Sequence, residues 1–163
     1  IVRTYYHTDH PEELFERCVK EVEQKLTHAV PIKPGLFELL DYLKSNGVKL
    51  AVASSSYMHV IESNLRTSKT ESYFDAVISG QKLGRGKPFP DVFLYAAEQI
   101  HMDPGDCYVF EDSINGVLAG LAAGCETIMV PDYVEPNEQI RSSSAHICSS
   151  LLEAKTQIEK GIF

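Results

Sequence analysis

Three short segments of the chain carry side chains that could bind a phosphate group together with a divalent cation. Ser54 follows an apolar run that is typical of a strand, Lys87 lies in a glycine-rich loop after a second such run, and Glu111 and Asp112 follow a third. A hydroxyl and an ammonium group can bind phosphoryl oxygens, whereas adjacent carboxylates suit a hard cation such as Mg2+, which prefers oxygen ligands. The three segments therefore indicate one site for a phosphorylated ligand and a metal ion, provided that the fold brings them together.

Each of these residues also has a simpler explanation. Ser54 could be a turn residue, Lys87 could be solvated, and Asp112 could cap the helix that follows it. Glu111 could be favoured electrostatically at the same helix N-terminus. The functional interpretation depends on their order, because the residues follow three successive strands.

Short apolar strands alternate with amphipathic helices along most of the chain. Strands are predicted over residues 48–53, 76–79, 107–110, 127–130 and 146–148, and helices over 11–29, 36–45, 57–65, 91–100, 114–123 and 151–159. This alternation predicts βαβ units and a doubly wound α/β fold with a parallel sheet. Ligands bind beyond the carboxyl ends of the strands in such sheets, and the polar residues cluster there.

Three motifs resemble the second, third and fourth motifs of haloacid dehalogenase-like hydrolases. The motifs are Val52-Ala53-Ser54-Ser55-Ser56, Gly86-Lys87-Pro88-Phe89-Pro90-Asp91 and Val109-Phe110-Glu111-Asp112-Ser113-Ile114-Asn115-Gly116. The most similar subgroup contains β-phosphoglucomutases and sugar-phosphate phosphatases, and the resemblance is close over residues 31–131. It implies the Rossmann-like core of that family, with a helical cap domain attached.

The resemblance also implies a role for each matching residue. Ser54 and Ser55 would bind the phosphoryl group, and Lys87 would stabilise the charged intermediate. Asp112 would ligate Mg2+, with Glu111 as a further ligand or as a supporting group. The family's nucleophile is an aspartate in a DxD motif on the first strand, which forms an aspartyl phosphate, and a second aspartate acts as general acid and base.

No segment of the sequence matches that first motif. Asp9 precedes a predicted helix and Asp41 lies within one, so neither follows an apolar strand. Because the family's first strand is central in the sheet, its loss predicts a gap between two half-sheets. The chain begins at Ile1 without a methionine, which suggests a trimmed or truncated product. We expect this chain alone to have no phosphatase turnover. A candidate partner is the missing N-terminal segment, supplied as a separate chain.

The first 30 residues are interpreted as the remnant of a helical cap, and residues 31–163 as the α/β core without its first strand. The segment Val30–Gly35 contains two prolines and predicts a hinge between the two parts. The helix predicted over residues 11–29 should then pack away from the sheet. Its apolar stripe, at i, i+4 spacing, consists of Leu14, Cys18, Val22 and Leu26.

Composition narrows the possible functions and partners. A net charge of -8 disfavours binding to nucleic acid or to anionic lipid through bulk electrostatics, although a local basic pocket can still bind an anion. No apolar run approaches membrane-spanning length. The four cysteines form no CxxC pair, which is typical of buried, reduced thiols in a cytoplasmic protein.

These observations favour a Mg2+-dependent phosphatase that acts on a small phosphorylated metabolite, with sugar phosphates as the first candidates and with an aspartyl-phosphate intermediate. A phosphosugar mutase is the alternative within the family, but Tyr57 and Met58 stand where the mutase subgroup tends to carry a Lys-Asn pair. A non-catalytic phosphate-binding relative is a second alternative. A receiver-type doubly wound domain is a weaker third, because it offers no role for the glycine-rich loop or the acid pair.

Overall fold

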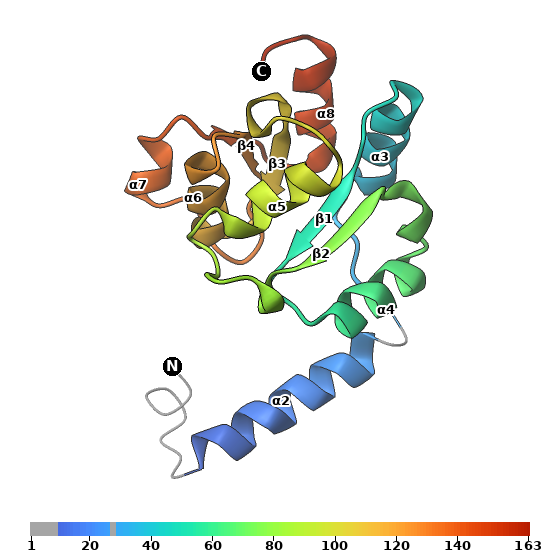
Figure 1. The fold of residues 1–163 in the computed structure, drawn as a ribbon, viewed down its shortest axis with the longest axis vertical. Coiled ribbons are helices and arrows are strands. Elements are labelled where there is room, and N and C mark those ends of the chain that lie inside the picture. Colours follow the sequence, from blue (N-terminus) through green and yellow to red (C-terminus); the bar gives the residue numbers. More distant parts are fainter. Residues whose placement is uncertain (1–9, 27–28) are drawn as a thin grey trace.

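The computed structural model describes residues 10–26 and 29–163 and contains two separate parallel sheets with helices around them (Figure 1). The strands are β1 (Ala51–Ser54), β2 (Ala76–Ser79), β3 (Tyr108–Glu111), β4 (Glu126–Met129) and β5 (His146–Ile147). The first sheet has the order β1-β2 and the second the order β3-β4-β5. The α/β class with parallel strands is therefore confirmed, and so is the predicted division into two half-sheets.

Helices cover both faces of the sheets. Helices α3 (Leu36–Ser45), α4 (Met58–Ser68), α5 (Asp91–Gln99), α6 (Ile114–Ala122), α7 (Glu138–Arg141) and α8 (Leu151–Glu159) belong to the α/β part, and α2 (Pro11–Leu26) precedes them. Successive side chains of a strand point to opposite faces. In β4, Ile128 packs with residues of α3 and α8, whereas Met129 packs with Val117 of α6. The two helix layers therefore lie on opposite faces, as the doubly wound fold requires.

One core cluster connects the two half-sheets. It contains Ile78 of β2, Phe93 of α5 and Val109 of β3, and the half-buried Ala53 of β1 packs against it. Helix α5 contacts both β1 and β2 while its buried side also reaches β3. Packing against α5 thus holds β1 and β3 in one body although no described strand joins them.

Several predicted boundaries were wrong by a few residues. Strand β1 begins at Ala51 rather than at Val48, because its ladder partner begins at Ala76. The preceding Leu50 N–H donates to the carboxylate of Asp75 (2.8 Å) instead. Strand β3 runs one residue further than predicted and includes Glu111, which pairs with Met129 of β4. Within α5, Phe93 and Ala97 are buried, whereas Leu94 is exposed.

Helix α2 lies apart from both sheets and approaches the rest of the chain beside α4 (Figure 1). Cys18 and Val22 of its predicted stripe are exposed, and Leu14 is half-buried. The side chain of Leu26 lies outside the described residues. The exposure of the stripe agrees with the prediction that this helix packs away from the sheet, whereas the domain boundary itself stays a prediction.

The segment that follows α2 is attached to the α/β core at its carboxyl end. Lys33 Nζ donates to the carbonyl of Pro131 (3.2 Å) and lies 3.6 Å from the carboxylate of Asp132. Gly35 adopts φ +85, and a Cβ at this position would collide with the backbone of Leu152 in α8. These contacts attach the second half of the Val30–Gly35 segment to the core, whereas the hinge itself stays a prediction.

The cysteines are free thiols in different environments. Cys125 and Cys148 are buried, Cys107 is half-buried and Cys18 is exposed, so the expectation of uniformly buried thiols was wrong for Cys18. Burial raises the pKa of Cys125 to about 11, with a smaller contribution from Cys107. Within the described residues, no helix is both long and apolar enough to cross a bilayer.

Candidate phosphate and metal site

Lys87 connects the carboxyl ends of the two half-sheets. Its Nζ donates to the carbonyl of Ala53 in β1 (3.3 Å) and forms an ion pair with the carboxylate of Glu111 at the end of β3. The ammonium also lies 4.6 Å from the centre of the Phe93 ring in α5. The Lys87 and Glu111 side chains are only 14% and 10% exposed. The structure thus brings the Lys87 loop and the Glu111-Asp112 segment into direct contact. The third predicted segment is adjacent, because Ser54 directly follows Ala53.

The burial of Lys87 changes one expectation from the sequence. A solvated lysine in a glycine-rich loop could be replaced with little effect on stability. Lys87 is instead the partner of a buried carboxylate, and removing it would leave Glu111 without its counterion. Its replacement should therefore affect folding as well as any phosphate chemistry.

Glu111 is held in place from its other side by the start of α6. Its Oε2 accepts hydrogen bonds from Ser113 Oγ (3.0 Å) and from the backbone N–H of Asp112 (3.3 Å). Ser113 in turn caps α6, accepting the N–H of Gly116 (3.0 Å). A Cβ on Gly116 would overlap the Glu111 carboxylate. Gly116 therefore provides space for that carboxylate, a role more specific than close packing of the helix.

Asp112 is exposed beside this buried pair. No group of three acidic, histidine or cysteine side chains among the described residues could by itself hold a metal ion. Mg2+ is commonly bound through one or two carboxylates, with water and substrate phosphate completing its coordination. Asp112 and its neighbourhood fit such an incomplete set, in which a phosphorylated ligand supplies further oxygens.

The serine loop after β1 is held by residues at the end of β2. Ser54 Oγ accepts the N–H of Ser56 (3.1 Å), and the buried Ser79 donates its hydroxyl hydrogen to the carbonyl of Ser56 (2.7 Å). Gln81 Nε2 donates to the carbonyl of Ser55 (2.6 Å). Ser79 and Gln81 were not predicted as supporting residues from the sequence. Their position gave a signal, because Ser79 ends the strand that pairs with β1, in register with Ser54.

The loop that carries Lys87 is fixed at both sides. Arg85 donates two hydrogen bonds to the carboxylate of Asp91 at the start of α5 (3.2 and 3.0 Å). The Arg85 guanidinium also lies 4.6 Å from the centre of the Phe89 ring. The Lys87–Pro88 peptide bond is cis. Arg85 is therefore paired with Asp91, whereas Lys87 of the same loop contacts β1 and the end of β3.

Of the two aspartates considered as nucleophiles, the structure describes the surroundings of Asp41 alone. Asp9 lies outside the described residues. Asp41 lies on α3 and accepts a hydrogen bond from the Tyr73 hydroxyl (2.6 Å), which raises the pKa of Tyr73. This contact explains Asp41 as a residue that ties α3 to the segment before β2.

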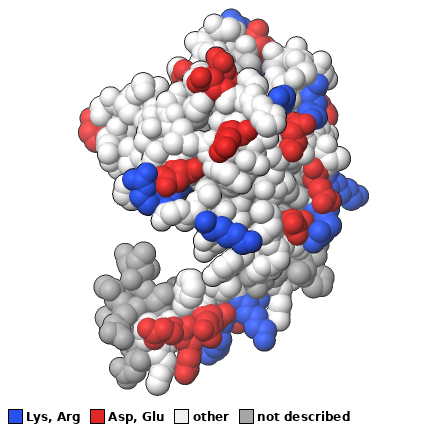
Figure 2. All heavy atoms as spheres, in the orientation of Figure 1, with Lys and Arg blue, Asp and Glu red and all other residues white. Residues whose placement is uncertain are grey.

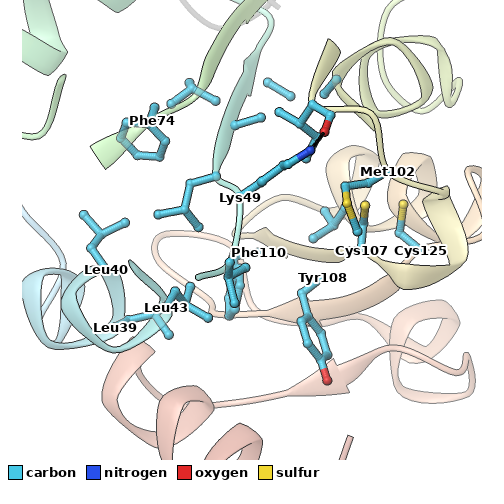
Figure 3. Close-up of a pocket in the computed structure, with 18 of the residues that line it drawn as sticks. Leu39, Leu40, Leu43, Lys49, Phe74, Met102, Cys107, Tyr108, Phe110 and Cys125 are labelled. Atoms are coloured by element: carbon cyan, nitrogen blue, oxygen red, sulfur yellow. Dashed lines mark hydrogen bonds between the residues drawn. The ribbon is translucent and has the colours of Figure 1, made fainter. Parts of the chain in front are cut away.

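A cavity of about 710 Å³ lies between β1 and β3 (Figure 3). Its walls come from both strand edges and from helices on both faces of the sheet. Leu39, Leu40 and Leu43 line it from α3, and Phe93 and Ala96 line it from α5. The predicted gap between the half-sheets is thus a partly open, mainly apolar cavity. Lys87 and Glu111 do not line it, but each adjoins a residue that does, since Lys87 contacts Ala53 and Glu111 follows Phe110.

The sequence profile of haloacid dehalogenase-like hydrolases matches residues 1–130. The chain belongs to this family. Over 125 residues it is 37% identical to the bifunctional riboflavin kinase/FMN phosphatase of Arabidopsis thaliana, an alignment that covers 76% of the chain and 33% of the relative. Over 120 residues it is 34% identical to hexitol phosphatase B of Escherichia coli K12, covering 74% and 54%.

Solved structures of the haloacid dehalogenase-like family agree with this assignment. CbbY of Rhodobacter sphaeroides, solved in complex with xylulose-(1,5)-bisphosphate, superposes with a TM-score of 0.75 at 25% identity, covering 90% of this chain and 67% of that chain. The chain spans only about a third to a half of the length of the two curated relatives. The family and the fold are therefore shown, whereas the activity of the whole protein is a matter for proposal.

Proposed function

We propose that the protein containing this chain is a Mg2+-dependent phosphatase that acts on a small phosphorylated metabolite, with sugar phosphates as the first candidates. The main observation behind the proposal is the Lys87–Glu111 pair between the ends of β1 and β3. Ser54 directly follows Ala53, whose carbonyl accepts a hydrogen bond from Lys87, and Asp112 directly follows Glu111. Phosphoryl transfer depends mainly on positioning and on stabilising negative charge. The surface offers no large field of one sign on the face in Figure 2, so this local site must supply the attraction for the phosphate.

Each residue receives a role that follows from its surroundings. Ser54 and Ser55 donate to phosphoryl oxygens from a loop held by the end of β2. Lys87 neutralises charge that develops on the phosphoryl group. Glu111 positions Lys87, because both of its oxygens are already engaged, and Asp112 would hold the metal ion. When bound, Mg2+ would screen the charge of the phosphate.

The attacking carboxylate in this proposal comes from a strand outside the described residues. We infer an aspartyl-phosphate mechanism because the family resemblance supplies it and because Asp41 has a structural partner elsewhere. By the same argument, this chain alone should have no turnover. Residues 1–30 are proposed to be part of a cap that closes over the substrate and excludes water.

A phosphatase is favoured over a mutase. Tyr57 and Met58 occupy the positions after the serine motif where the mutase subgroup tends to carry Lys-Asn. The curated relatives that align over three quarters of this chain include two named as phosphatases, hexitol phosphatase B and the FMN phosphatase. Transfer of the phosphoryl group to water therefore explains the sequence better than transfer to a second sugar hydroxyl.

The test is a substitution of Asp112 in the parent protein that includes the upstream coding sequence. Asp112→Asn should reduce Mg2+-dependent hydrolysis of a panel of sugar phosphates by at least about a hundredfold, since it removes the proposed metal ligand. Asp106→Asn, which changes an exposed aspartate before the opposite end of β3, is the matched control and should retain activity. Unchanged hydrolysis by Asp112→Asn would overturn the metal assignment. Phosphate binding without any turnover in the parent would favour the non-catalytic alternative.

A further inference from the structure

Two of the free thiols lie opposite each other at the amino ends of β3 and β4. The two strands pair in parallel with Tyr108 opposite Glu126, so the residues one position earlier, Cys107 and Cys125, also face each other. The backbone agrees, because the N–H of Glu126 donates to the carbonyl of Cys107 (3.0 Å). Side chains at facing positions of a parallel pair project to the same face of the sheet. The two thiols are therefore neighbours in space, although the whole of α6 separates them in sequence.

Their packing places the two sulfur atoms in the same environment. Cys125 is a buried member of the core cluster that contains Val109 and Phe93, and the half-buried Cys107 packs against that cluster. Figure 3 shows both thiols side by side on the wall of the cavity, next to Met102. Burial raises the pKa of Cys125, and the charge of an ionised Cys107 adds to the rise, as expected for adjacent thiols.

The spacing of the strands suits a covalent bond between these thiols. Neighbouring strands lie about 4.8 Å apart, and the Cα atoms of a disulfide are usually about 4.4–6.8 Å apart. Both cysteines directly precede the first residue of their strand. Gly124, before Cys125, adopts φ +79 and has open space around it among the described residues. Small backbone adjustments at these positions can therefore bring the sulfur atoms together without breaking the strand ladder.

Cys107 is the thiol that a reagent in solution meets first. It is half-buried, whereas Cys125 is only 7% exposed. The Cys107 thiol donates to the carbonyl of Asp103 (3.3 Å), a weak hydrogen bond that is readily given up. Burial, and then the carboxylates of Asp106 and Asp103, raise the pKa of Cys107. Since the thiolate is the reactive form, the reaction should be slow at neutral pH and faster in mild alkali.

We propose that Cys107 and Cys125 form a dithiol site that a small-molecule disulfide oxidises to an intramolecular disulfide bond. The Cys107 thiolate attacks one sulfur of the small disulfide, which forms a mixed disulfide and releases one small thiolate. Cys125 then loses its proton and attacks the Cys107 sulfur, which releases the second small thiolate. The protein loses two protons and two electrons, and the small disulfide is reduced to two thiols.

The new bond closes a loop that contains β3 and α6, with Glu111 and Asp112 inside it. A disulfide that closes a loop of about this length stabilises a protein mainly by restricting its unfolded state. We expect oxidation to raise the Tm of the chain by about 5–10 °C. The bond lies at the amino end of β3 and the acid pair at its carboxyl end, so the dithiol site is independent of the proposed phosphatase function.

The experiment treats the folded chain with oxidised glutathione at about pH 8.5, where more of each thiol is ionised. The chain carries Cys18→Ser, which removes the exposed thiol on α2. Intact mass should fall by two hydrogens. A protease that cleaves after glutamate cuts at Glu111, between the two cysteines, so their fragments should stay joined until a reductant is added. Cys148→Ser, in a separate core cluster, is the matched control and should form the same cross-link.

Two further variants test the order of the steps. Cys125→Ser should stop at the mixed disulfide, with one glutathione on Cys107. Cys107→Ser should take up at least about tenfold less glutathione in the same time, because Cys125 is shielded from the solvent. The fragment map of the chain with both cysteines decides the proposal even if a variant does not fold.

Three outcomes would overturn the proposal. Cys107 and Cys125 that both remain free thiols after prolonged treatment would show that the pair does not react. A cross-link to Cys148, or one between two copies of the chain, would show that the facing positions on β3 and β4 do not decide the pairing. A Tm lowered by oxidation would show that the strands do not accommodate the bond.

Discussion

Separating Lys87 from Glu111 should destabilise the chain far more than separating an ordinary surface ion pair. The two side chains are 14% and 10% exposed, so removing either charge leaves the other largely desolvated. Loss of one partner from a fully buried pair costs about 3–5 kcal/mol. Because some exposure remains here, we expect Lys87→Met and Glu111→Gln each to lower the free energy of unfolding by about 2–4 kcal/mol.

The double variant distinguishes an ion pair from simple packing. Gln at position 111 can still accept a hydrogen bond from Ser113, and Met at position 87 retains an apolar side chain beside Phe93. The double variant should therefore cost less than the two single changes added together, with a coupling of about 2 kcal/mol.

Urea denaturation of the chain, followed by far-UV circular dichroism, measures these free energies. The matched control is the Lys155–Glu159 pair on α8, whose side chains are 21% and 38% exposed. Lys155→Met should change stability by no more than about 0.5 kcal/mol. Two results would together refute the reasoning that each member of this pair depends on the other. Each single variant would have a free energy of unfolding within about 0.5 kcal/mol of the wild type, and the double variant would show only the sum of the two single effects.

Two further predictions concern the surroundings of the site and the core. Gly116→Ala should displace the Glu111 carboxylate and lower the free energy of unfolding by about 1–3 kcal/mol. The same change in a Glu111→Ala background should cost much less, because the carboxylate is then absent. Urea denaturation of the wild type, the two single variants and the double variant would measure this difference. The buried thiol of Cys125 should make the chain less stable as pH rises from about 9 towards 11, because burial raises its pKa from 9.0 to about 11. Free energies of unfolding from urea denaturation at pH 8 and pH 10.5 should show a pH-dependent loss of about 2 kcal/mol that Cys125→Ala lacks. An equal loss in both proteins would contradict this assignment.

The sequence predicted the elements of the fold well because their patterns are local. Helix α3 over Leu36–Ser45 and strand β2 over Ala76–Ser79 begin and end where the apolar pattern and the flanking turn residues place them. Strand β1 was predicted three residues too early, since an apolar run does not reveal where its ladder partner begins. The short helix α7 was missed altogether, as a segment of four residues has too little periodicity to read.

The residue types at the strand ends predicted a phosphate and metal site, and its function stays a prediction. Sequence alone could not decide what each side chain faces. That Glu111 pairs with Lys87, and that Gly116 leaves room for its carboxylate, depends on the approach of α6 to β3. The burial of Lys87 depends in turn on α5 and on the edges of two strands that are far apart in sequence. Identity and order of the groups are local properties of the chain, whereas desolvation and pairing arise only when distant segments pack together.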